Sequence, residues 1–434
     1  MPVFRSRSVE EIVTARLRTS KHSVRDGTGI QARNLSSHRS IMSLQGDPRL
    51  ISCLIAGALL FLCGAAKVAA QSEESKPRLF NPHGDFRLRM EQDWDSLQGD
   101  GTERDDRLRL RFRLRLGLDL NFSDQWSARV QLRSGQHKSQ QSPHITIYDF
   151  DGGDSGPYQF DFDYWYLSYK SGNFEAWAGR NQLSFFHQDD LFLIDNITFA
   201  GVGGSYRQQL SKGALTWRAN YVALPVGMRD FSGTSFIGQV GYERELQATG
   251  FTVAAGVFAS RADPDDPVGE MLLTENNTRD YDLLNLQFQH RSTAFGRPLR
   301  LGADYSHNFK DYSDAPVGSF SEFHQNHLDG YVLEALWGRS GKAGDWQVGY
   351  YYSHVEALAA NSSYIQDDWA RWGTATQARL TNMTGSEFRF LYTIAPNQNI
   401  FARLFFVDAI DLLEPGDTSL EDGKRFRIEY NVSF

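Results

Sequence analysis

Apolar and polar residues alternate most strictly between Arg107 and Leu120, RLRLRFRLRLGLDL. The leucines and Phe112 occupy one parity, whereas five arginines, Gly117 and Asp119 occupy the other. A period of two predicts a β-strand, because a helix would scatter both sets around its circumference. The run also exceeds the soluble-strand length of about 5–6 residues, and a membrane-crossing strand needs about 9–11. We therefore expect a strand with lipid on one side and water on the other.

Weaker forms of the same alternation recur down the chain. They predict an all-β fold, a transmembrane antiparallel up-and-down β-barrel of about 16 strands. One hairpin more or less around 160–181 or 355–394 would give 18 or 14 strands instead. The connections alternate between long and short, as expected of a barrel with long outer loops and short periplasmic turns. The expected strands are 83–91, 107–120, 126–133, 160–169, 174–181, 198–209, 214–223, 236–244, 251–260, 281–290, 298–307, 329–337, 345–354, 386–394, 400–408 and 424–434.

Composition agrees with this pattern. The mean hydropathy is −0.46, yet the chain contains 30 Phe, 18 Tyr and 9 Trp. A polar average with many aromatics suits a barrel, whose alternate residues face lipid and water. The formal net charge is −8, from 45 basic and 53 acidic residues, which removes the electrostatic basis for binding nucleic acid.

The N-terminal part predicts export. Residues 1–41 are rich in Arg and Ser and lack apolar periodicity, so we interpret them as a disordered or mis-assigned extension. Within 42–70, an apolar run from Leu50 to Leu62 precedes the small residues before Gln71. This arrangement predicts a secretory signal peptide cleaved near Ala70, a single membrane anchor being the alternative.

Cleavage there would leave a short periplasmic leader, 71–82, followed by the barrel, 83–434. Cys53 and Cys63 are the only cysteines and lie in the predicted signal peptide. The mature chain would therefore have no disulfide and no thiolate metal site. We expect neither a metal site nor a cofactor.

The chain ends on Phe434, after a strand in which Phe426, Ile428, Tyr430 and Val432 share its parity. A C-terminal aromatic residue in this setting resembles the insertion signal of outer-membrane proteins. We therefore expect Phe434 to act as the assembly signal for the barrel-assembly machinery.

Several segments together resemble a known family. They are the Arg-rich strand, WSARVQLRSG, FDYWYLSYK, FEAWAGRNQLSFF and DNITFAGVGGSY, in that order. The sequence resembles a proteobacterial putative porin family over about residues 83–210 and at the C-terminus. Alginate-export barrels are a more distant likeness. The resemblance implies a pore in the outer membrane of a Gram-negative bacterium and leaves the solute open.

Nine arginines share the polar parity of three neighbouring strands. Lipid exposure would cost roughly 2–4 kcal/mol for each Arg at the bilayer midplane, so we expect them to line the lumen. Such a basic wall would concentrate anions. The alternative is structural: the arginines neutralise acidic lumen residues and hold the wall together. The set is Arg87, Arg89, Arg107, Arg109, Arg111, Arg113, Arg115, Arg129 and Arg133.

A counter-charge lies in the third long loop, 182–197, which carries Asp189, Asp190 and Asp195 but no Lys or Arg. The loop is also rich in Phe and Leu, which suits a loop folded into the lumen as a constriction. An ordinary external loop is the alternative. The eight long loops together hold 30 acidic and 8 basic residues, so the outer rim is strongly acidic.

Enzyme motifs are weak. His324 and His327 form HQNH without a metalloprotease glutamate, and we interpret them as solvated loop histidines. A lipase-type barrel would need a Ser–His pair at the lipid-facing rim, for which His290 and His307 are candidates by sequence proximity only. No GxSxG or P-loop motif is present, so we expect no enzyme.

Three functional hypotheses follow. The first is a channel for passive diffusion of small hydrophilic, mainly anionic, solutes. The second is a substrate-dedicated exporter or importer for an anionic oligosaccharide, and the third is a barrel enzyme or adhesin. The expected partners are outer-membrane lipid, lipopolysaccharide, the assembly machinery and small solutes, with no nucleic acid. The sequence leaves open whether the barrel forms a homotrimer.

Overall fold

The computed structural model describes residues 79–137, 141–152, 156–193, 195–263, 280–369 and 381–434. The predicted extension, the signal peptide with Cys53 and Cys63, and most of the leader lie outside these residues. The fold described here belongs to the compact unit Ser72–Phe434. No helix in the described part of the chain is long and apolar enough to cross a membrane.

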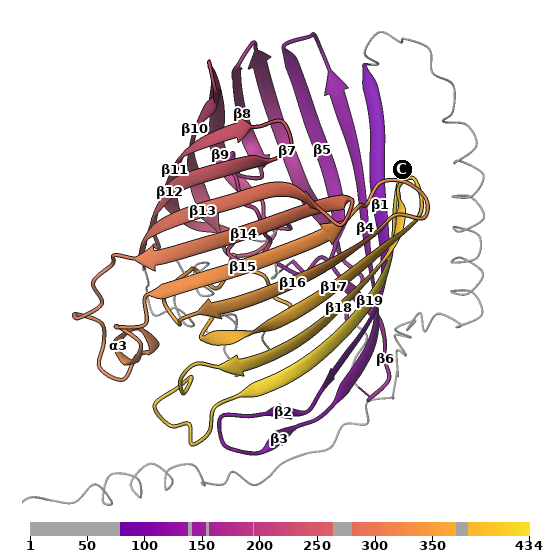
Figure 1. Cartoon of the computed structure of the whole chain (residues 1–434). Helices are drawn as coiled ribbons and strands as arrows, with labels where there is room; N and C mark the ends of the chain where they lie inside the picture. The colour runs from indigo at the N-terminus through magenta and orange to yellow at the C-terminus, as the bar shows by residue number, and fades with distance from the viewer. Residues whose placement is uncertain (1–78, 138–140, 153–155, 194, 264–279, 370–380) are drawn as a thin grey trace, which may run out of the picture. The chain divides into compact units, whose positions relative to one another are not determined.

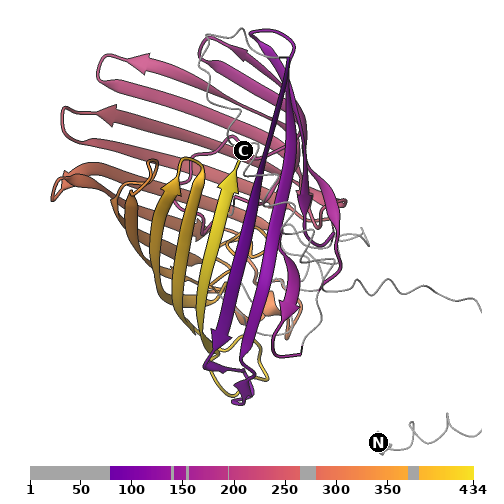
Figure 2. The ribbon, with the colours of Figure 1, turned by 90° about the vertical axis from the view of Figure 1, so that its right-hand side faces the viewer.

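Sixteen antiparallel wall strands close into a barrel (Figures 1 and 2). β1 pairs with both β4 and β19, which joins the two edges of the sheet. All sixteen predicted strands are present, with ends within five residues of those expected, so the predicted fold is confirmed. The wall segments are β1 (Phe80–Trp94), β4 (Arg107–Asn121), β5 (Trp126–Ser134), β6 (Ile145–Asp149), β7 (Phe160–Ser171), β8 (Phe174–Asn181), β9 (Phe199–Leu210), β10 (Gly213–Pro225), β11 (Phe231–Glu245), β12 (Gly250–Arg261), β13 (Tyr281–Ala294), β14 (Arg297–Asn308), β15 (Asp329–Gly338), β16 (Trp346–Val355), β17 (Met383–Ala395), β18 (Gln398–Ala409) and β19 (Asp422–Ser433).

The third wall strand is interrupted. β5 and β6 both pair with β4, β5 along residues 115–121 and β6 along residues 109–112. The chain leaves the wall after Ser134 and rejoins it at Ile145. Because β5 and β6 together occupy one position in the wall, the 17 segments form 16 wall strands. Gly135, with φ +127°, lies where the chain departs, and a Cβ there would lie 2.9 Å from Pro143. The periodicity of 126–133 did not predict this continuation.

Long and short connections alternate, so they gather at opposite ends of the barrel. A small hairpin, β2 (Ser96–Leu97) and β3 (Glu103–Arg104), and one short helix, α3 (Phe320–Phe323), lie in long loops. Figure 1 shows both at the end of the barrel opposite the C-terminus. Phe295 and Gly296 form a two-residue turn with φ +51° and +73° at the short-turn end. Two consecutive positive φ values match the turn that continues the twist of a β-hairpin.

The two faces of the wall differ as the alternation predicted. On β1, Met90 is 43 % exposed on the outer face, whereas Arg89 and Glu91 are 3 % and 1 % exposed on the inner face. Leu116 of β4 also lies on the outer face. The inner face is buried because chain segments from the long-loop end fold into the barrel.

Three such segments contribute, and each forms hydrogen bonds with the wall or with one another. They belong to 135–144, 182–198 and 356–369. Gln141 donates to the carbonyls of Ser362 and Ile365, and Asn196 donates to the carbonyl of Gln141. The barrel interior therefore contains a packed core of loop and wall side chains instead of a wide open lumen.

Candidate functional site

The arginines of β1 and β4 form layers across the closing seam of the barrel. The pairing register sets Glu429, Arg89 and Arg111 side by side, and the next layer sets Arg427, Glu91 and Arg109 side by side. The first strand of the chain, β1, thus brings basic and acidic residues of β4 and of the last strand, β19, together across the wall. This arrangement follows from strand register, because directly opposed residues on one face of a sheet lie about 4.5–5.5 Å apart.

Each of the nine predicted arginines has an acidic partner within 4.0 Å. Arg107 binds Asp93, Arg109 and Arg111 bind Glu91, Arg113 and Arg115 bind Asp85, and Arg129 binds Asp119. Arg87 and Arg89 bind Glu429 at 3.2 and 2.7 Å, and Arg133 lies 4.0 Å from Asp163. The inner wall is therefore an ion-pair network, which is the geometry that the structural alternative required.

Sequence reasoning missed five further inward-facing arginines: Arg389 of β17, Arg403 of β18, Arg425 and Arg427 of β19, and Arg300 of β14. Arg389 and Arg403 share Glu387, and Arg425 binds Asp93 at 2.5 Å. Arg425 and Arg427 share the parity of the other inward residues of the last strand, so that parity could have revealed them. These arginines were missed because they lie far from the Arg-rich strand in sequence, and the sequence pattern does not show that they join it in one cluster.

The 182–198 loop lies inside the barrel and crosses to this network. The backbone N–H of Phe186 donates to Gln239 of β11, and that of Ser184 donates to Asn220 of β10. At its far end, Asp190 accepts from Arg389 at 2.7 Å and from Gln366 at 3.0 Å. The loop thus connects opposite sides of the interior, and its role as a constriction stays a prediction.

The three aspartates of this loop differ in environment. Burial raises the pKa of Asp190, but Arg389 and Arg403 outweigh burial and hold that pKa below its ordinary value. Burial raises the pKa of Asp189, whose carboxyl contacts that of Asp304. Asp195 is largely exposed and lies 3.7 Å from His187. Only Asp190 is therefore firmly paired with the arginines.

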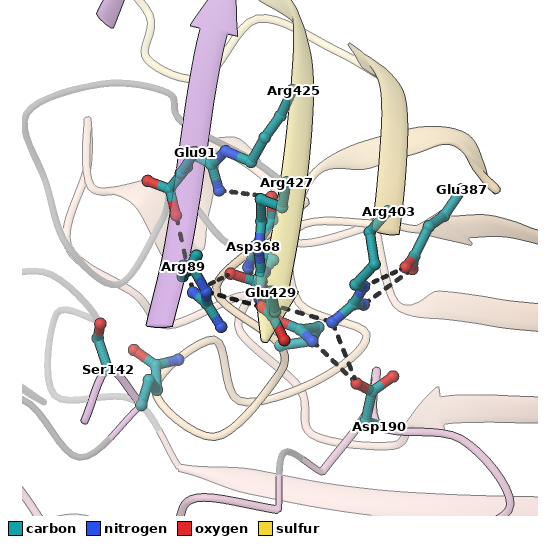
Figure 3. A network of polar contacts seen from close by, with 12 residues as sticks. Arg89, Glu91, Ser142, Asp190, Asp368, Glu387, Arg403, Arg425, Arg427 and Glu429 are labelled. Carbon is teal, nitrogen blue, oxygen red and sulfur yellow. Dashed lines mark hydrogen bonds and ion pairs between the residues drawn. The ribbon is translucent and has the colours of Figure 1, made fainter. Parts of the chain in front are cut away.

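A second loop, 356–369, inserts Asp368 into the same cluster (Figure 3). Its carboxylate binds Arg427 and lies 3.6 Å from Arg89 and 3.5 Å from Arg403. Arg425 also donates to the backbone carbonyl of Asp368. No sequence pattern points to this residue, because it is a single aspartate in a long loop.

Between the loops and the wall lies a polar cavity of about 340 Å³. Six arginines and five aspartates line it, together with Tyr351 and Phe401. The guanidinium of Arg389 lies 3.8 Å from the Tyr351 ring centroid. The charged lining residues are Arg87, Arg89, Arg113, Arg300, Arg389, Arg403, Asp189, Asp190, Asp195, Asp367 and Asp368.

The histidines do not form a recognisable catalytic site. His307 binds Asp329 at 2.8 Å on the outer rim, and no serine hydroxyl bonds to it among the described contacts. Within the described residues, no group of three or more His, Cys, Asp or Glu side chains could hold a metal ion. His324 is fully buried, so its interpretation as a solvated loop histidine was wrong; the loop packs it beneath Phe320 and Phe323.

Phe434 closes the seam between the first and last strands. Its backbone N–H donates to the carbonyl of Gly84, and the N–H of Gly84 donates back to Phe434. The Phe434 ring covers Gly84 so closely that a Cβ at residue 84 would lie 2.7 Å from it. The C-terminal residue therefore has a defined place in the barrel wall.

Comparison with known proteins agrees with this architecture. Residues 81–249 match the model of a family described as "Putative porin", which confirms the resemblance noted from the sequence. A search of curated proteins found no match. The structure of Pseudomonas putida OprB at high pH is similar, with a TM-score of 0.50 and 12 % identity over 82 % of this chain and 94 % of OprB.

Two other similar structures have lower scores. Salmonella typhi OmpF, in a complex with daunomycin, has a TM-score of 0.47 and 11 % identity over 82 % of this chain and 97 % of its own. Acinetobacter baumannii OccAB3 has a TM-score of 0.46 and 10 % identity over 82 % and 99 %. At these identities, only the likeness to OprB bears on this chain, and it bears on the fold alone.

Proposed function

We propose that this outer-membrane porin-type channel passes small hydrophilic solutes by passive diffusion and weakly prefers anions. The family match and the barrel fold support a channel over an enzyme. The solute class is inferred from the charges around the polar cavity, which is the observation that carries the proposal.

Arginines are in excess at the cavity. Six guanidinium groups line it against five carboxylates. Burial raises the pKa of Asp189 and of Asp367, which disfavours their charged forms. A positive field in a narrow, partly desolvated passage attracts anions more strongly than the same charges would in open water.

The preference should be weak for two reasons. Every arginine of the predicted wall is paired with a carboxylate, so its field falls off quickly with distance. The acidic outer rim also attracts cations, although screening limits its reach to about 8 Å at physiological salt. We therefore expect anion preference to fall as ionic strength rises.

Arg87 offers the sharpest test. It lines the cavity, is only partly buried, and shares Glu429 with Arg89 and Arg427, so its loss would not leave that carboxylate unpaired. We expect Arg87→Gln to fold and to shift the reversal potential in a salt gradient toward cations. The measurement is made on single channels in planar bilayers.

Arg129→Gln is the matched control. Arg129 has the same charge on the same wall but pairs with Asp119 and is absent from the cavity lining. It should leave the reversal potential unchanged. If both variants behave like wild type, or if both shift equally, the cavity does not set selectivity; a wild-type reversal potential of cation-selective sign would refute the anion preference.

A dedicated transporter for an anionic oligosaccharide is the second candidate. Tyr351 and Phe401 beside several arginines could hold a sugar ring and its carboxylate together. Current through such a channel would be blocked saturably by acidic oligosaccharides and not by neutral ones. A linear, nonselective decrease in current would favour passive diffusion.

A further inference from the structure

Two arginines lie directly opposite one another on the inner face of the seam. The strand register pairs Arg87 of β1 with Arg113 of β4, and like charges in such a position destabilise a sheet. Arg87 lies 3.2 Å from Glu429, and Arg113 lies 2.6 Å from Asp85. Both carboxylates belong to neighbouring layers of the wall. The layer that the two arginines share contains Asn431 and, among the described residues, no carboxylate.

Both guanidinium groups keep N–H donors that form no hydrogen bond within the described part of the chain. Arg87 donates through Nε to Asn431 at 2.6 Å, and its two terminal nitrogens remain available. Arg113 uses Nε and Nη2 for Asp85, which leaves Nη1 available. Both arginines line the polar cavity of about 340 Å³. The terminal nitrogen pair of a guanidinium matches the two oxygens of a carboxylate.

A buried histidine lines the same cavity. His144 ends the inserted segment 135–144 and is only 5 % exposed. Arg111 holds this segment, because it donates to the Ser142 hydroxyl at 2.8 Å and to the His144 carbonyl at 3.5 Å. Nε2 of His144 is buried and has no hydrogen-bond partner among the described residues. Such a nitrogen is unfavourable, because it has lost its hydrogen bond to water without a replacement.

The charges around this imidazole are mainly positive, and four arginines act on it most strongly: Arg87, Arg89, Arg111 and Arg113. In the ion pairs around the seam, nine arginines share six carboxylates. Asp367 also acts on Arg89 and Arg111, which still leaves arginine in excess. Water in the cavity could bond to His144, but only an anion would also balance this charge.

We propose that Arg87, Arg113 and His144 form a binding subsite for the carboxylate of a small hydrophilic acid. The terminal nitrogens of Arg87 donate to the two oxygens, and Nη1 of Arg113 and Nε2 of His144 supply the remaining donors. A phosphate would bring further charged oxygens close to Glu429 and Asp85, so a carboxylate fits better.

The size of the cavity limits the ligand. Its volume of about 340 Å³ lies at the lower end of ligand pockets, which span about 300–1,000 Å³. The ligand is therefore the size of a single sugar acid, not of an oligosaccharide chain. This inference rests on the proposed channel function of the same cavity, and it makes His144 a residue that determines which anions are retained.

The test measures binding of D-glucuronate to the barrel purified in detergent, which requires no current through the channel. We expect isothermal titration calorimetry at neutral pH and low salt to show one glucuronate bound per chain. D-glucose, which lacks the carboxylate, should not bind, and inorganic phosphate should compete less well than glucuronate. His144→Leu should weaken glucuronate binding by about tenfold or more, because hydrogen bonds to charged groups are the stronger class. His144→Gln, which restores an N–H donor, should recover part of this loss.

His83→Leu is the matched control. His83 also lies on the inner face of β1, but it contacts Gln131 at 3.2 Å and is absent from the cavity lining. This variant should bind glucuronate like wild type. A heat-modifiable shift in gel mobility checks that each variant folds, and the comparison of the three solutes on wild type holds even if His144→Leu does not.

Three outcomes would overturn the proposal: wild type that does not bind glucuronate, phosphate that binds as tightly as glucuronate, or folded His144→Leu with unchanged affinity. Failure of the channel function would look different. A barrel that binds glucuronate with the expected specificity but conducts no current in planar bilayers would refute the channel and leave the subsite in place.

Discussion

The inner faces of the barrel differ on its two sides. The charged wall, formed by the inner faces of β17, β18, β19, β1 and β4, carries arginines paired with carboxylates. The apolar wall, formed by the inner faces of β8 to β12, carries Trp177, Phe199, Val222, Leu224 and Ile237. Both walls hold the same two loops, 182–198 and 356–369, but through different interactions.

On the apolar wall, loop side chains are anchored by packing. Phe185 packs on Phe258 with ring centroids 4.9 Å apart, and Tyr364 packs on Phe199 at 5.2 Å. Full burial of such a side chain contributes about 1.5–3 kcal/mol with little dependence on pH or salt. This wall therefore fixes where the loops lie.

On the charged wall, the loops end on Asp190 and Asp368. Buried ion pairs add little net stability, because desolvation offsets the Coulomb attraction, yet removal of one partner is costly. Loop position therefore depends on the apolar wall, whereas the electric field inside the barrel depends on how the charges of the charged wall are balanced.

The largest effect is expected at the centre of the charged wall. Arg427 is completely buried and binds both Asp368 and Glu429. Arg427→Met would remove one of the three arginines that contact each of two buried carboxylates, Asp368 and Glu429, at a cost of up to about 3–5 kcal/mol in the free energy of unfolding. Urea titration of the barrel in detergent measures this. A loss below about 1 kcal/mol would mean that water reaches the network freely.

Loss of an apolar contact that holds a loop should be detected in the single-channel conductance. Phe185→Ala removes the ring that packs on Phe258 and against Gly256, while the wall strands keep all their backbone pairing. A Phe→Ala change in a core costs about 3–5 kcal/mol, and less where the site is only partly buried. We expect a folded barrel with higher single-channel conductance, because the loop is released from this wall. Unchanged conductance would show that the ion pairs alone hold the loop.

The seam of the charged wall gives a kinetic test. Deleting Phe434 removes both backbone hydrogen bonds to Gly84 and the ring that covers this glycine. Assembly into vesicles should slow, as followed by the heat-modifiable gel shift. Phe434→Tyr keeps the ring and the backbone pairing and is the control. Equal assembly rates for the deletion and the control would show that Phe434 does not contribute to assembly.

The smallest effect concerns pH. Burial raises the pKa of Asp189 above its ordinary value of 3.8, so its contribution to loop anchoring is present below that value and is lost as pH rises through the raised pKa. Current fluctuations should therefore grow above pH 3.8 in wild type, whereas Asp189→Asn should show no such rise. Asp195→Asn, at an exposed position of the same loop, is the control. A pH response that persists in Asp189→Asn would assign it to another group.

The sequence determined which segments form the barrel wall. Lipid-facing and water-facing residues alternate along each strand, and this alternation can be recognised within the strand alone. Leu110, Phe112 and Leu114 identify their strand without reference to any other part of the chain, and weaker alternation marks the other strands. It also placed the arginines on the inner face, since lipid excludes them.

Only the tertiary structure decided what those arginines do. Arg89 meets Glu429 across 340 residues of sequence, and Arg427 meets Asp368 from a loop without any pattern. The same reason hid the burial of His324 and the entry of 356–369 into the barrel. A side chain's parity in a strand is set by its own neighbours, but its charge partner is set by barrel closure and strand register, which no local stretch of sequence contains.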